Sequence, residues 1–229
     1  MNNIKRYNLF ILFSTIARNI VEVFSSVLLY KIGYTFREIL LFYSILYFTG
    51  MITSIGSIYL TKIIKSKYIL MLSSIIFSGS FYFMSVMDRT FINLVIFSII
   101  NGIGAYSYHS LRHYYAIKVI DNHNNKEIGN ILIFSNIATI FSSLIGAYIQ
   151  ELLSVFILAI IIVIISIIAI IPIVRLKDIE DNNTIKLEKI SKNKLLFFLL
   201  EQAKVINLTL QPLYLYLFIN SRVTYVGIF

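Results

Sequence analysis

Seven long apolar runs, each of 20 to 28 residues, take up most of this chain of 229 residues. A helix needs about 20 mostly apolar residues to cross the roughly 30 Å of hydrocarbon in a bilayer. The pattern therefore predicts an all-α fold, a polytopic transmembrane helical bundle with about seven spans. The predicted spans are Tyr7–Tyr30, Glu38–Leu60, Tyr68–Met87, Phe91–Lys118, Ile128–Gln150, Leu152–Val174 and Leu195–Ile219.

The connectors between the first six runs are short, so consecutive helices are predicted to be antiparallel neighbours. The exception is the stretch of residues 175–194, which is twenty residues long and rich in charge. We therefore expect three parts. Residues 1–174 hold six spans, residues 175–194 a charged loop, and residues 195–229 a seventh span; the family resemblance described below implies that these are an N-terminal six-helix bundle, a cytoplasmic central loop and the first helix of an incomplete C-terminal bundle.

Composition supports a membrane protein. Hydrophobic residues make up 58% of the chain and charged residues only 14%, and the mean hydropathy is +0.83. Soluble domains carry about 25% charged residues. The absence of cysteine excludes disulfides, thiolate metal sites and cysteine nucleophiles. No clustered acid, base or nucleophile set stands out, so an enzyme is not expected, and no cofactor or metal is implied.

The distribution of basic residues predicts the orientation. With the N-terminus inside, the inner segments hold thirteen Lys and Arg residues and the outer segments four. Cytoplasmic loops carry the excess of Lys and Arg. The net charge of +9 thus belongs beside anionic lipid, and nucleic acid is not an expected partner. We expect a multi-pass protein of a bacterial plasma membrane with a cytoplasmic N-terminus, which disfavours a seven-helix sensor with its N-terminus outside.

Ionisable residues inside spans are the most informative feature. Each charge at the bilayer centre costs roughly 2.5–3.5 kcal/mol on insertion scales, so it needs a partner or a wet cavity. Arg18 and Glu22 lie on one polar stripe of the first span, four residues apart and close enough to pair. They are either a mutually neutralising structural pair or groups that bind a solute or a proton.

The fourth and seventh spans carry similar stripes. In the fourth, Asn101, His109 and Arg112 share one face, with His113 beside it. No carboxylate lies near the two histidines in sequence, so a titrating histidine is favoured over a metal ligand. Arg112 either reaches the headgroups or binds an anion. In the seventh, the stripe consists of Glu201, Lys204 and Gln211.

The remaining spans hold no central charge. The third contains only serines as polar residues and the sixth is almost wholly aliphatic, so both are expected to face lipid. The second and fifth carry small and hydroxyl residues that favour close helix packing. The abundant Tyr and Phe are interpreted as interface belts and packing.

Several segments resemble the major facilitator superfamily of secondary transporters. Leu29–Thr35 resembles the outer turn between that family's first two helices, and Gln211–Leu217 the outer part of its seventh. The loop after the second span resembles the family's Gly-x-x-x-Asp-Arg-x-Gly-Arg gate signature, with Gly56, Lys62 and Lys65 in place but Leu60 where the aspartate belongs.

The resemblance implies two six-helix bundles and a central cavity lined by helices one, four, seven and ten. The function it implies is secondary active transport of a small polar solute by alternating access. Arg18 or Arg112 would attract an anionic group, and Glu22 or Glu201 would carry a proton. The chain ends where an eighth helix would start, so we expect a truncated protein whose C-terminal half is missing or is supplied by a second chain. The alternative is a non-transporting membrane remnant.

Overall fold

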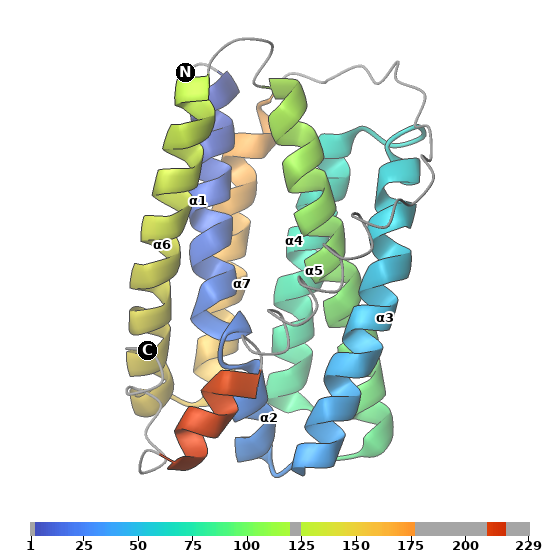
Figure 1. The fold of residues 1–229 in the computed structure, drawn as a ribbon, viewed down its shortest axis with the longest axis vertical. Helices are drawn as coiled ribbons and strands as arrows, with labels where there is room; N and C mark the ends of the chain where they lie inside the picture. The colour runs from blue at the N-terminus through green and yellow to red at the C-terminus, as the bar shows by residue number, and fades with distance from the viewer. Residues whose placement is uncertain (1–2, 120–124, 177–209, 219–229) are drawn as a thin grey trace, which may run out of the picture.

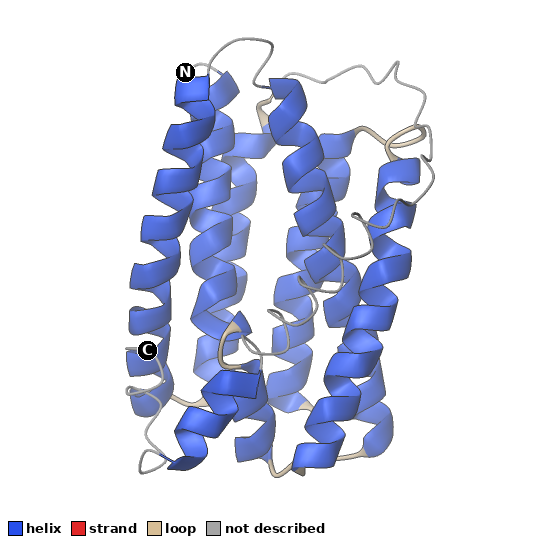
Figure 2. Cartoon of the chain, in the orientation of Figure 1, coloured by secondary structure: helices blue, strands red, loops and turns tan. Residues whose placement is uncertain are grey.

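The computed structural model describes residues 3–119, 125–176 and 210–218, and within these ranges the chain is helical throughout, joined by short turns (Figures 1 and 2). Residues 210–218 form a further helical segment. The helices with defined bounds are α1 (Asn3–Glu22), α2 (Ser25–Ile32), α3 (Phe36–Leu60), α4 (Ser66–Val86), α5 (Phe91–Val119), α6 (Asn125–Leu152) and α7 (Val155–Val174).

The predicted spans are confirmed as helices for the first six runs. Among the described residues, α3, α4, α5 and α7 are each long and apolar enough to cross a membrane, and α1 with α2 makes one further, bent span. The chain is therefore an integral, multi-pass membrane protein. Of the seventh predicted span, only residues 210–218 are described.

The helices pack as two groups of three. Helix α1 packs along α6 and α7, α5 packs along α3 and α4, and contacts between α4 and α7 join the groups (Figure 1). Two described helices, α1 and α5, carry charges near their centres. Each of them contacts both other helices of its group.

The first predicted span is broken directly after Glu22. Helices α1 and α2 meet at a bend of 42°. The amide of Phe24 donates to Val21 O, three residues back, which leaves the Ile20 carbonyl outside the regular ladder. Gln150 Nε2 on α6 donates to Ile20 O at 2.8 Å and satisfies it. A broken span in lipid requires such a substitute donor.

Two glycines allow the helices of the second group to pack closely. A methyl group at Gly50 of α3 would lie 2.3 Å from the Tyr106 ring of α5, and one at Gly104 of α5 would lie 2.6 Å from the backbone nitrogen of Phe77 on α4. Both contacts are too short for any side chain. Glycine at these positions therefore fixes the places of Tyr106 and Phe77.

The end of α7 is held by cations from two other helices. Arg6 of α1 donates to the carbonyl of Arg175, and Lys67 Nζ of α4 donates to Leu176 O at 3.1 Å. Carbonyls at a helix C-terminus carry partial negative charge and lack intrahelical donors, so cations are favoured there. These bonds hold the end of α7 against α1 and α4.

Candidate functional site

Arg18 lies inside the bundle, near the middle of the bent span. Its side chain is only 6% exposed. The guanidinium carbon lies 3.9 Å from the centre of the Phe77 ring on α4 and 4.4 Å from that of Tyr108 on α5. Aromatic faces attract a cation at this range. The two rings therefore offset part of the cost of burying the charge.

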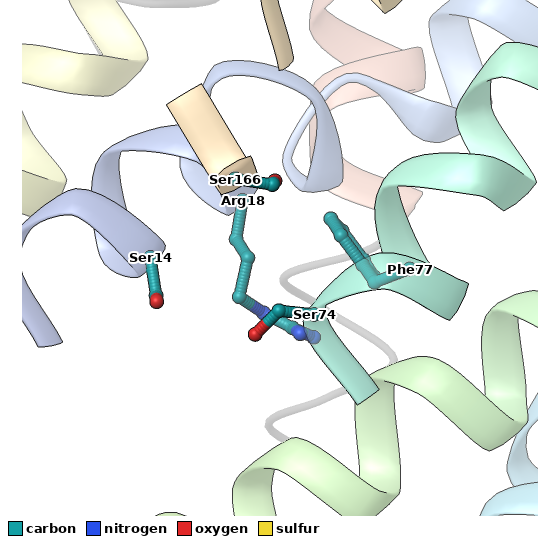
Figure 3. A pocket seen from close by; sticks show the side chains of 5 residues that line it. All are labelled: Ser14, Arg18, Ser74, Phe77 and Ser166. Carbon is teal, nitrogen blue, oxygen red and sulfur yellow. The ribbon is translucent and has the colours of Figure 1, made fainter. Parts of the chain in front are cut away.

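A small cavity adjoins this guanidinium. It has a volume of about 10 Å³ and is lined by Ser14, Arg18, Ser74, Phe77 and Ser166, from α1, α4 and α7 (Figure 3). Arg18 Nη2 and Ser14 Oγ form no hydrogen bond within the described residues. A polar cavity of this size has room for about one water molecule. It is too small to hold an organic solute.

Glu22 joins the two helices that carry the charges. Its Oε2 lies 3.5 Å from Arg18 Nε, and its Oε1 lies 3.8 Å from His109 Nε2 on α5. The side chain of Glu22 is 41% exposed and that of His109 is 45% exposed. The structure thus brings together three predicted site residues. Arg18 is inside the bundle, and Glu22 and His109 are partly exposed at its surface, which we call the open face.

Tyrosines continue the site along α3 and α5. The ring centroids of Tyr43 and Tyr47 are 6.0 Å apart, those of Tyr47 and Tyr106 6.2 Å, and those of Tyr106 and His109 6.4 Å. The sequence pattern is interpreted as interface belts and packing for these tyrosines. The one sequence signal for them is spacing: Tyr43 and Tyr47 are four residues apart, and Tyr106 is three residues before His109.

The other predicted residues of α5 are held by packing. Asn101 is buried. Arg112 Nη2 donates to Ser135 Oγ on α6 at 2.9 Å, and the Arg112 carbonyl accepts from the Tyr7 hydroxyl of α1 at 2.6 Å. Arg112 therefore links α5 to α6, and its backbone links α5 to α1.

The predicted gate residues lie apart from this site. Gly56 is in the last part of α3 with open space beside it, and Lys62 and Lys65 are exposed in the turn before α4. Gln211 is exposed in the segment of residues 210–218. Glu201 and Lys204 lie outside the described residues.

The third predicted span differs from its expected lipid-facing role. Half of the apolar window of α4 is buried, and this helix contributes Ser74 and Phe77 to the surroundings of Arg18. The buried serines of α4 donate to carbonyls of their own helix, as Ser73 and Ser74 do to Leu70 O. Because their hydroxyls are satisfied within the helix, these serines can be buried in the core, and Ser74 can also line the small cavity beside Arg18.

Among the described residues, no three His, Asp or Glu side chains lie close enough together to hold a metal ion. The described residues bring together a partly exposed carboxylate, an imidazole and a buried guanidinium.

No curated protein matches this sequence. The family model of the Major Facilitator Superfamily matches residues 7–229. The match covers almost the whole chain, and it agrees with the helical membrane fold. The chain therefore belongs to the Major Facilitator Superfamily and is a membrane transporter of that type.

Proposed function

We propose that this transporter moves a small polar solute by alternating access, as a secondary active carrier, with the Glu22–His109 face of α1 and α5 as its solute site. The observation that carries the proposal is the cluster of Arg18, Glu22 and His109 near the middle of the spans. A charged cluster at this depth is expensive and marks a solute or ion pathway by default.

The proposal assigns different roles to the three residues. Glu22 and His109 are partly exposed and would contact a solute, and Arg18 holds the carboxylate from inside the bundle. In transporters built from two bundles, the solute binds near the midplane, and one bundle rocks against the other. We place the N-terminal bundle at residues 1–174, the cytoplasmic central loop at 175–194, and the start of the second bundle at 195–229.

We also propose a cytoplasmic N-terminus in a bacterial plasma membrane, on the basis of the bias of Lys and Arg toward the inner segments. On this orientation Lys62 lies inside and Arg89 outside. The contacts of Arg6 and Lys67 with the end of α7 then lie at the inner face, where basic side chains are favoured.

The lack of native cysteines allows a direct test by single-cysteine labelling in sealed vesicles of known orientation. His109→Cys is expected to react with a membrane-impermeant reagent added from either side, because the site opens alternately. Lys62→Cys should react only from inside and Arg89→Cys only from outside. Ser80→Cys, fully buried on α4, is the unreactive control. Labelling of position 109 from one side only contradicts alternating access.

A further inference from the structure

The open face of the site presents a negative charge. Glu22 is 41% exposed, whereas Arg18 is 6% exposed and stacks between the Phe77 and Tyr108 rings. The guanidinium therefore lies inside the bundle. The free space beside it is a cavity with room for about one water molecule. A solute that approaches from the open face meets the carboxylate first.

A row of aromatic rings leads away from that carboxylate, beginning at His109, whose Nε2 lies 3.8 Å from Glu22 Oε1. Tyr43, Tyr47, Tyr106 and His109 form a continuous row, with neighbouring ring centroids 6.0 to 6.4 Å apart. The face of an aromatic ring carries partial negative charge. Ammonium groups bind within about 6 Å of a ring centroid, so a carboxylate at the end of such a row offers them both a counter-charge and aromatic contacts.

The packing fixes these rings in place. Tyr106 lies directly over Gly50 of α3, where no side chain could be accommodated. Tyr47 meets Tyr106 edge to face at 84°, and Tyr106 meets His109 at 63°. Rings held in this way lose little freedom when a ligand binds, which favours affinity.

Among the described residues, the arginine closest in sequence to His109 does not offer an anion site. Arg112, one turn beyond His109, is directed to Ser135 of α6. His113 is exposed on the same helix, and α3 contributes Tyr43 and Tyr47. Within the described residues, an anionic solute would have to lie against Glu22 with the imidazole of His109, itself 3.8 Å from that carboxylate, as its neighbour.

We propose that this face binds a small organic cation, a protonated or quaternary ammonium group, with Glu22 as counter-charge and Tyr47 and Tyr106 as aromatic walls. The inference rests on the proposed transport function, since it names the class of solute. Arg18 is a positioning residue: its ion pair and its two ring contacts hold Glu22 at the end of α1.

The test is equilibrium binding of radiolabelled tetramethylammonium to the purified full chain in lipid nanodiscs. Glu22→Gln is expected to lower affinity by at least about tenfold, since a hydrogen bond or ion pair to a charged group contributes roughly 1.5–3 kcal/mol. The matched control is Glu151→Gln, at the exposed end of α6, which should leave binding unchanged. Neutral tert-butanol and anionic methanesulfonate should fail to compete.

A second pair of variants keeps the test valid if loss of Glu22 disturbs folding. Tyr106→Leu should weaken binding by about two- to thirtyfold, and Tyr106→Phe, which keeps the ring, should retain it. The inference is overturned if the wild-type chain does not bind tetramethylammonium, if methanesulfonate competes equally, or if Tyr106→Leu and Tyr106→Phe bind alike.

The outcome is separate from that of the transport proposal. Cation binding with position 109 labelled from one side only supports the cation site and rejects alternating access. Two-sided labelling without cation binding supports alternating access and rejects the cation site.

Discussion

The guanidinium of Arg18 lies 3.9 Å from the centre of the Phe77 ring, and this contact joins the charged middle of α1 to a helix without charges at its centre. Phe77 in turn packs against Gly104 of α5. Phe77 therefore contacts both the Arg18–Glu22 ion pair of α1 and the closely packed backbone of α5. A substitution of Phe77 is expected to affect both contacts.

Replacing Phe77 by leucine removes the aromatic face and keeps an apolar side chain. We expect the free energy of unfolding to fall by about 1–2 kcal/mol, because the buried guanidinium loses one of its two rings. Thermal unfolding in detergent measures the change. The matched control is Phe48→Leu, at a position 62% exposed on α3, which should change stability little. Equal effects at both positions would show that the ring contact of Arg18 contributes nothing.

The Gly104 contact gives a prediction with an internal control. Gly104→Ala should destabilise the protein by about 2 kcal/mol or more, because the new methyl group would overlap the backbone of α4. Gly56→Ala, where nothing lies within 4 Å of the new methyl group, should be neutral or stabilise by about 0.5–1 kcal/mol through helix propensity. Thermal unfolding should occur at a lower temperature in Gly104→Ala and at an unchanged or higher temperature in Gly56→Ala, and the account of α4–α5 packing fails if the two variants are equally stable.

The bend after Glu22 depends on a donor from α6. Gln150→Leu leaves the Ile20 carbonyl without its partner, at a cost of about 1–3 kcal/mol. We expect lower thermal stability together with weaker tetramethylammonium binding, because Glu22 is at the end of α1, next to the bend. Ser44→Ala is the control, since the Ser44 hydroxyl is exposed and donates only within its own helix. If a stably folded Gln150→Leu protein binds tetramethylammonium as the wild type does, the hydrogen bond at the bend is not needed to position Glu22.

The spans could be predicted because their apolar runs have the length of the bilayer. Each of the first six predicted runs coincides with a helix, or with the pair α1 and α2, to within a few residues. The break after Glu22 could not be predicted, because Glu22-Val23-Phe24-Ser25 contains neither proline nor glycine. Its support comes from Gln150, which is more than 120 residues away in sequence.

The candidate site was predictable only in part. The spacing of Arg18 and Glu22 on one helix predicts their pairing, and the structure has them 3.5 Å apart. The partners on other helices follow from tertiary packing. Phe77 and Tyr106 reach the site because glycines on the facing helices leave room for them, and a pattern read along one helix does not contain that information.

The central claim, that this protein carries a solute across the membrane through the Glu22 face, is tested most directly by counterflow. Vesicles containing the purified full chain are loaded with unlabelled tetramethylammonium and diluted into a trace of the labelled ion. The account predicts a transient accumulation of label above its equilibrium level, absent with Glu22→Gln and in protein-free vesicles. Label that enters no faster than in protein-free vesicles, with a chain that binds tetramethylammonium, would contradict it.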